Sequence, residues 1–188
     1  MISSEMLKYG GPIISKPLGK LLNFTLSTGN FPENWNESFV VLLHKSGSKL
    51  EPSNYRGSSI TSNLGNLFNR VIHSRLLKFI NNMFLISENQ IGFKAKNRTV
   101  DHLFSLKTTI DQYKTKKKKV FAAFIDLRKA FDTIWRVGLF YKLLKSHMSK
   151  QLFNIILSMY ANTTTRIQFS NGLSAIFTSE CGVKQRMF

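Results

Sequence analysis

Two of the chain's four aspartates, Asp126 and Asp132, lie close together behind an apolar run. The run, residues 120–125, is typical of a buried strand, which would place Asp126 at the strand's end. A short helical turn, residues 128–131, would then lead to Asp132. Burying a carboxylate without a pairing group costs roughly several kcal/mol. Because carboxylate oxygens are preferred ligands of Mg²⁺, we expect Asp126 to hold a divalent cation.

Each aspartate also has a purely structural interpretation. Asp126 could cap the turn that follows the predicted strand, since Asp accepts hydrogen bonds from free backbone amides. For Asp132 we favour such a local cap or salt bridge over metal binding. The four histidines have no metal-ligand spacing, and Cys181 has no histidine placed by sequence to activate it. The chemistry expected of this region therefore rests on Asp126.

The charge balance of the chain predicts a polyanionic partner. Lys and Arg number 27 against 10 Asp and Glu, a net charge of +17 over 188 residues. We expect nucleic acid rather than a membrane surface, because the basic residues are dispersed and no apolar stretch reaches membrane-spanning length. A single cysteine excludes an internal disulfide. No signal peptide is apparent, so we expect an intracellular protein, in nucleus or cytoplasm.

The elements that must position these residues follow from hydrophobic periodicity and turn signals. A helix should begin with Ser15 as its cap and end at Gly29-Asn30, and Trp35 should fill a core gap next to Pro32. Asn171-Gly172 predicts a type I′ hairpin turn between residues 165–170 and 173–179. The remaining elements are strands over 39–43 and 53–60 and helices over 64–80, 103–113, 137–144 and 152–160. Helices with few strands predict an α+β or α/β domain.

Six short segments occur in one order along the chain: Phe31–Trp35, Leu43–Gly47, Asn54–Arg56, Gln90–Lys94, Phe124–Asp132 and Gly182–Gln185. In this order and spacing they resemble the reverse transcriptase domain of non-LTR (LINE-type) retrotransposons. The resemblance covers residues 2–185. Group II intron and retron reverse transcriptases are less similar around residues 32–35.

The resemblance implies an α+β, right-handed polymerase fold, with the fingers and part of the palm but no thumb. Residues 1–118 would form the fingers-type region and residues 119–188 a partial palm. The implied activity is RNA-directed DNA polymerisation on an RNA template. In this reaction the 3′-hydroxyl of a DNA primer attacks the α-phosphate of a deoxynucleoside triphosphate, the nucleotidyl group is transferred to the primer, and pyrophosphate leaves. Two Mg²⁺ ions assist such a transfer by holding the attacking and leaving oxygens. The oligomeric state is not indicated.

The resemblance also assigns residues to the site. Asp126 corresponds to the family's first catalytic, metal-binding aspartate, and the carbonyl of Leu127 to an additional metal ligand. Phe131 resembles the steric gate that excludes a ribose 2′-hydroxyl. Lys45 and Arg56 resemble fingers residues that contact the incoming triphosphate, and Gln185 resembles a glutamine lining the nucleotide and template side.

A basic loop next to Gly92 is a candidate for contact with the template backbone. Its cations are Lys94, Lys96 and Arg98, and a glycine permits close approach of a ligand to the loop. The lysine run 116–119 is more typical of a solvated loop, and any phosphate attraction there would be nonspecific and sensitive to salt.

The sequence departs from the family in three places. Gly57 stands where proline is usual, and Arg186 stands where a second glycine is usual. The paired aspartates that complete the family's metal site do not occur, since no aspartate follows Asp132. A frameshift or a truncated gene copy would explain this pattern. We therefore expect the isolated chain to be inactive as a polymerase, and the alternative function is a catalytically dead nucleic-acid-binding remnant.

Overall fold

A computed structural model describes residues 2–94, 97–169 and 171–183. The chain divides into two compact units. The first contains residues Met1–Leu77 and Lys129–Phe188, and the second contains Lys78–Arg128.

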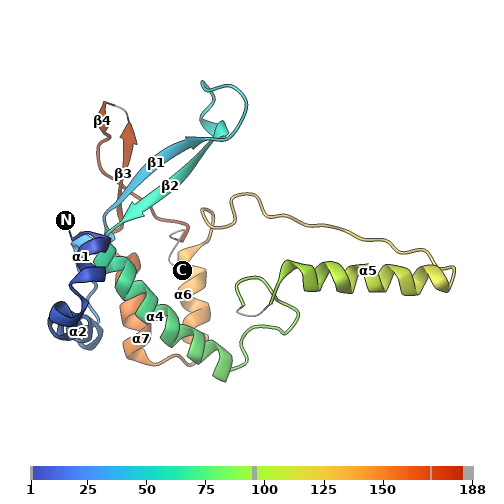
Figure 1. Ribbon diagram of the computed structural model, residues 1–188, viewed down its shortest axis with the longest axis horizontal. Coiled ribbons are helices and arrows are strands. Elements are labelled where there is room, and N and C mark those ends of the chain that lie inside the picture. The colour runs from blue at the N-terminus through green and yellow to red at the C-terminus, as the bar shows by residue number, and fades with distance from the viewer. Residues whose placement is uncertain (1, 95–96, 170, 184–188) are drawn as a thin grey trace. The chain divides into compact units, whose positions relative to one another are not determined.

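A mixed sheet organises the first unit. Its strands are β1 (Ser38–His44), β2 (Tyr55–Thr61), β3 (Thr164–Phe169), β4 (Gly172–Leu173) and β5 (Phe177–Thr178). β1 pairs antiparallel with β2 and parallel with β3, and β3 pairs antiparallel with β4 and β5 (Figure 1). The short 3-10 helix Pro52–Asn54 precedes β2, so the strand begins two residues later than predicted. The helices and this mixed sheet confirm the predicted α+β class.

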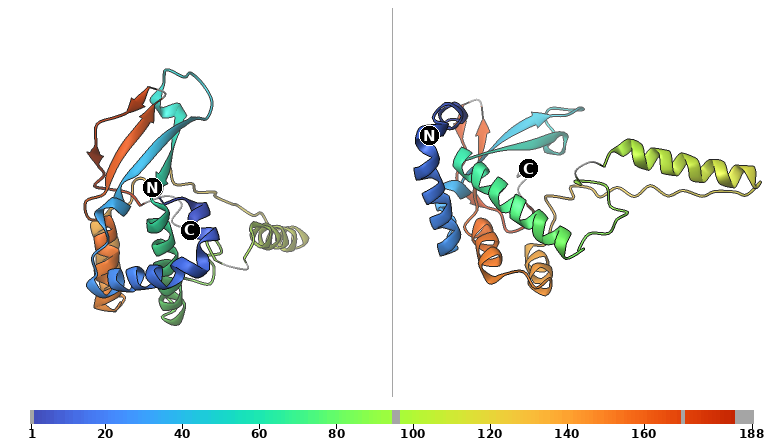
Figure 2. Two further views of the ribbon diagram at one scale, coloured as in Figure 1. Left: turned by 60° about the vertical axis from the view of Figure 1, so that its left-hand side comes forward. Right: turned by 60° about the horizontal axis from the view of Figure 1, so that its bottom comes forward.

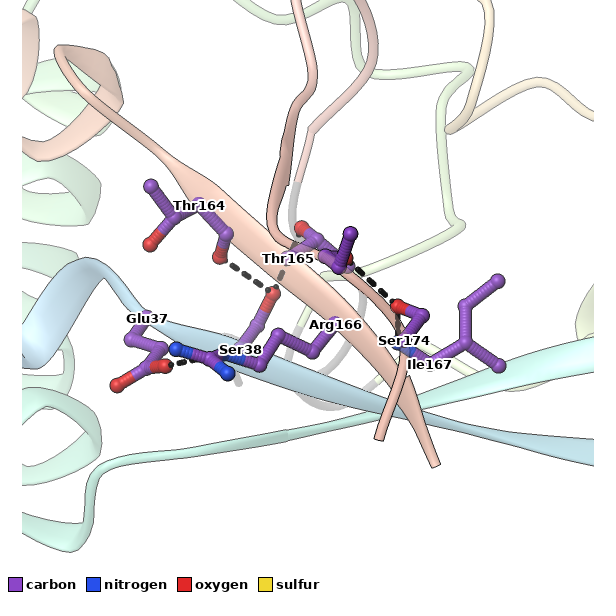
Figure 3. A network of polar contacts seen from close by, with 8 residues as sticks. Glu37, Ser38, Thr164, Thr165, Arg166, Ile167 and Ser174 are labelled. Carbon is purple, nitrogen blue, oxygen red and sulfur yellow. Dashed lines mark hydrogen bonds and ion pairs between the residues drawn. The ribbon is translucent and has the colours of Figure 1, made fainter. Parts of the chain in front are cut away.

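Polar side chains fasten β3 to β1, although the two strands are far apart in sequence (Figure 3). Ser38 Oγ lies 3.3 Å from the carbonyl oxygen of Thr164 and 3.0 Å from Thr165 Oγ1. Beside them, Arg166 Nε donates to Glu37 Oε1 over 3.2 Å. These contacts hold the start of β1 in register with the start of β3.

Helices of the first unit pack at the end of this sheet. They are α1 (Ser4–Tyr9), α2 (Gly11–Thr28), α3 (Glu33–Asn36), α4 (Asn63–Asn82, whose last turn belongs to the second unit), α6 (Arg136–Lys145) and α7 (Lys150–Tyr160). α7 contacts both α2 and α6 and lies between them (Figure 2). Among the described residues, no helix has the length and apolar character needed to cross a bilayer.

The boundaries of α2 correct one prediction. The helix begins at Gly11 with Pro12 in its first turn, so Ser15 is an interior residue and not the cap. Proline is favoured in the first turn because the amide it lacks would be unpaired there, and Pro12 meets this condition earlier than Pro17 does. The predicted end is confirmed, since Gly29 adopts a left-handed φ of 71° and closes the helix.

An aromatic cluster forms the centre of the core. The rings of Phe31, Trp35 and Phe68 lie 5.5–5.9 Å apart. Ile72 of α4 and Ile155 of α7 are buried against them. The predicted place of Trp35 in the core is confirmed.

The C-terminal hairpin forms one residue out of the predicted register. Phe169 pairs with Gly172, so Gly172 belongs to β4. Gly172 has a φ of 144°, a value that side chains disfavour. The glycine is therefore needed at the strand end, whereas the prediction placed it within the turn.

The second unit contains helix α5 (Thr99–Thr115) and the chain that follows it. Residues 119–127 form no strand, which contradicts the predicted strand over 120–125, and these residues are exposed together with Asp126. A strand requires a hydrogen-bonded neighbour to be stable. No strand pairs with this segment among the residues described, so its apolar composition alone does not form or bury it.

Candidate functional site

A pocket of about 520 Å³ lies in the first unit. One side is formed by the β1–β2 ribbon and its connection, and the other by the turn before α6 and the segment after β5. Among the described residues of its lining, the cations are Lys45, Arg56, Lys129 and Arg136, and the acidic residue is Asp132. A concave, cation-rich site of this kind suits an anionic ligand. We call it the basic pocket.

Strand alternation produces one side of the basic pocket. Val40 pairs with Ser59 and Leu42 pairs with Gly57, so Val40, Gly57 and Ser59 share one face of the ribbon. A Cβ atom added to Gly57 would lie 3.0 Å from Val40 Cγ1. The glycine found here in place of the family's usual proline therefore allows close contact with β1.

Lys45 and Arg56 lie at the end of the ribbon and both line the basic pocket. The amide of Lys45 donates to the carbonyl of Asn54 over 2.9 Å, which extends the strand pairing by one step. The connecting loop is braced by Asn54 Nδ2 donating to the Ser48 carbonyl and by Tyr55 Oη donating to the Lys49 carbonyl, each over 2.9 Å. Two residues that are 11 positions apart are thus both part of the lining of one pocket.

The opposite side joins two segments that are distant in sequence. The amide of Val183 donates to the carbonyl of Phe131, and the amide of Gly182 donates to that of Ile134, each over 2.8 Å. Gly182 is buried and has a φ of 79°, and a Cβ atom there would lie 2.8 Å from the Asp132 carbonyl oxygen. Only glycine fits this approach. We call residues 131–134 and 179–183 the pocket wall.

Sequence reasoning missed Lys129 and Arg136, which also line the basic pocket. Arg136 is the first residue of α6. A cation at a helix N-terminus opposes the helix dipole, so another interaction should compensate for it. The unfavourable position of Arg136 at the start of a helix is the feature of the sequence that could have revealed this residue.

The structure leaves the predicted catalytic residue outside this unit. Asp126 and Leu127 belong to the second unit, where both are exposed. Phe131 belongs to the pocket wall through its carbonyl, and its side chain is 42% exposed. Gln185 lies outside the described residues.

The predicted template-binding cations have local contacts. Lys94 is half-buried, and its Nζ donates to the Ser87 carbonyl over 2.8 Å. Arg98 caps α5, with its backbone amide donating to Asp101 Oδ2 over 2.8 Å. Lys96 lies outside the described residues. Of the three predicted cations, Lys94 is therefore the one whose charged group is shown in contact with the loop's own backbone.

The donor set does not fit a two-metal centre. Within residues 2–94, 97–169 and 171–183, no three His, Cys, Asp or Glu side chains come together as potential ligands. Each divalent ion in a transfer site is usually held by carboxylates. The described residues therefore do not supply a complete metal site.

Comparison with known proteins gives a consistent family. The model of the family described as "Reverse transcriptase (RNA-dependent DNA polymerase)" matches residues 43–185. The chain is 28% identical over 169 residues to the RNA-directed DNA polymerase from mobile element jockey of Drosophila melanogaster, covering 89% of this chain and 18% of that protein. It is 24% identical over 155 residues to a Pol polyprotein from type-1 retrotransposable element R2 of Nasonia vitripennis, covering 82% and 15%. The chain spans less than a fifth of these relatives' length.

Proposed function

The chain belongs to the reverse transcriptase (RNA-dependent DNA polymerase) family, and we propose that its basic pocket binds the triphosphate of an incoming deoxynucleotide. The supporting observation is that Lys45 and Arg56 line one pocket together with Lys129 and Arg136. The family as a whole implies a nucleic acid template and nucleotide substrates. The chain is accordingly a piece of a nucleotidyltransferase, as the sequence motifs predicted.

The chemistry of phosphates supports this use of the basic pocket. Hydrogen bonds from a charged donor to a phosphate oxygen are about twice as strong as neutral ones, and an arginine can donate two in parallel. In phosphoryl and nucleotidyl transfer the protein mainly positions the phosphates and neutralises their charge. The cations Lys45, Arg56 and Lys129 of the pocket lining meet that requirement.

The remaining site assignments are part of the same proposal. Phe131 would act as the sugar gate, and Gln185 would line the nucleotide and template side. Lys94, Lys96 and Arg98 would contact an RNA template paired with a DNA primer. In the polymerase fold, residues 1–118 would be the fingers-type region and 119–188 part of the palm.

Divalent metal ions serve the reverse transcriptase family, and we propose Mg²⁺ for this chain, with Asp126 as one ligand and the Leu127 carbonyl as another. When bound, such ions neutralise charge on the phosphates and the attacking oxygen. The described residues supply no complete set of ligands, so these two are proposed only as a part of that centre.

Titration calorimetry with dTTP tests the basic pocket directly. Lys45→Ala and Arg56→Ala should each weaken dTTP binding about tenfold, the loss of about one charge-assisted hydrogen bond. Lys49→Ala is the matched control, since it removes the same charge from the same loop at a residue outside the pocket lining. Its dTTP affinity should change less than about twofold, in keeping with a solvated charge.

Equal weakening by all three substitutions would contradict the proposal. Binding would then depend on net charge rather than on the pocket. That result would favour the alternative of a noncatalytic nucleic-acid-binding remnant.

A further inference from the structure

We infer that Arg136 is a positioning residue of the basic pocket: it holds the pocket wall together and does not itself need to bind the nucleotide. The effect of Arg136 on nucleotide affinity rests on the proposed nucleotide-binding function, whereas the contacts of its guanidinium group do not depend on that function.

The Arg136 side chain binds three backbone carbonyls of one segment. Nε donates to Gly182 over 2.8 Å, Nη2 donates to Cys181 over 3.2 Å, and Nη1 donates to Ser179. Nη1 also lies 3.3 Å from Thr163 Oγ1, and that hydroxyl lies 3.3 Å from the Ser179 carbonyl. The flat guanidinium therefore fixes the backbone path of residues 179–182.

The ring of Tyr160 fixes the guanidinium from a further direction. Arg136 Cζ lies 5.3 Å from the centre of this ring, within the range of a cation–π contact. Tyr160 ends α7, whereas Arg136 begins α6. The side chain is consequently held by two helices and by the segment that it organises.

Arg136 holds residues 179–183 against the turn that carries Phe131 and Asp132. The Gly182 and Val183 amides can donate to Ile134 and Phe131 only while the 179–183 backbone keeps its path. Because the bonds of Arg136 end at Gly182, one residue before Val183, loss of the guanidinium should release both amide bonds. The two halves of the pocket wall would then separate.

Arginine suits this position and lysine does not. A guanidinium has five donors in a rigid plane, whereas an ammonium is a compact group on a flexible stem. Lysine preserves the charge at the start of α6 but cannot span three carbonyls and a hydroxyl. Arg136→Lys therefore separates the role of geometry from that of charge.

The decisive measurement is native-state amide hydrogen exchange of the full 188-residue chain. In Arg136→Lys, protection of the Gly182 and Val183 amides should fall about tenfold or more, while the buried Ile155 amide keeps its protection. The matched control is Arg166→Lys, which alters an arginine paired with Glu37 and outside the pocket lining. It should leave exchange at both amides unchanged.

Nucleotide affinity provides the second readout. In Arg136→Lys the affinity for dTTP should fall about threefold to tenfold although net charge and global unfolding are unchanged. If Arg136→Lys does not fold, Gly182→Ala perturbs the same wall with arginine in place, since its Cβ would press on the Asp132 carbonyl. It should also lose Val183 protection and dTTP affinity.

Unchanged exchange at Gly182 and Val183 in the folded Arg136→Lys variant would overturn the inference. Lost protection with undiminished dTTP affinity would overturn the positioning role as well. If the wild-type chain binds no dTTP, the proposed function fails, whereas the exchange comparison still decides whether Arg136 holds the wall.

Discussion

Two apolar regions of the chain differ in their exposure to solvent. In the first unit, Phe31, Trp35 and Phe68 are each less than 8% exposed and lie ring to ring. In the second unit, Phe121, Phe124 and Ile125 of the apolar segment 120–125 are 83–91% exposed. Both regions look like core in the sequence. Apolar composition is therefore not what separates them.

The difference lies in the partners that each region has within its own unit. The buried aromatics come from α3, α4 and the loop between α2 and α3, and α7 packs against them. Each element covers the apolar face of another, which removes that surface from water. The apolar segment has no paired strand among the residues described. Burial thus depends on neighbouring elements, and the comparison can be tested by removing side chains from each region.

The largest effect is expected for Trp35→Ala. Removing a fully packed indole leaves a cavity among Phe31 and Phe68, and such changes cost about 3–5 kcal/mol. Urea unfolding followed by circular dichroism measures the loss. Trp135→Ala is the matched control, because Trp135 is 72% exposed, and it should cost less than about 1 kcal/mol. Similar losses for the two tryptophans would break the comparison.

A smaller effect is expected for a buried amide of the same core. Asn36 is 2% exposed, and its Nδ2 donates to the Ala161 carbonyl over 2.8 Å and to Ser158 over 3.4 Å. Asn36→Leu should cost about 1–3 kcal/mol, since it leaves the partly buried carbonyls of Ala161 and Ser158 without this donor. Urea unfolding again provides the free energy.

Asn69→Leu is the matched control for this amide. Asn69 is also buried, but its Oδ1 has no hydrogen-bond partner among the residues that the structure describes. Replacing it removes an unsatisfied oxygen, so the free energy of unfolding should stay within about 1 kcal/mol or increase. A larger cost at Asn69 than at Asn36 would show that shape, not hydrogen bonding, governs these positions.

Much of the fold could be predicted because its signals are local. The period of Leu64, Phe68 and Ile72 predicted α4, and the apolar run before His44 predicted β1. The helix that ends at Gly29 was predicted, but its predicted start at Ser15 was wrong, because Pro12 and Pro17 could each occupy a first turn. The strand over 120–125 was wrong because pairing depends on neighbours that a single segment does not reveal.

The sequence predicted residues of the candidate site only where these belong to motifs of the reverse transcriptase family. Lys45 and Arg56 were predicted through family resemblance and line one pocket. Arg136 was missed, because its acceptors are backbone carbonyls more than 40 residues away, and carbonyls have no residue type to recognise. Asp126 was placed on a strand that the structure does not form, so its role as a metal ligand stays a prediction.

The smallest effect is expected in the apolar segment itself. Phe124 is 83% exposed, so Phe124→Ser should change the free energy of unfolding by less than about 0.5 kcal/mol. Phe68→Ser is the matched control, and removal of this fully buried ring should cost at least about 3 kcal/mol. Hydrogen exchange adds a backbone readout, since unpaired amides at 121–125 should exchange without protection. A loss above about 2 kcal/mol for Phe124→Ser, or strong protection at these amides, would mean that the segment is a buried strand in solution. The sequence interpretation of residues 120–125 would then be right, and Asp126 would stand at the end of a strand as first expected.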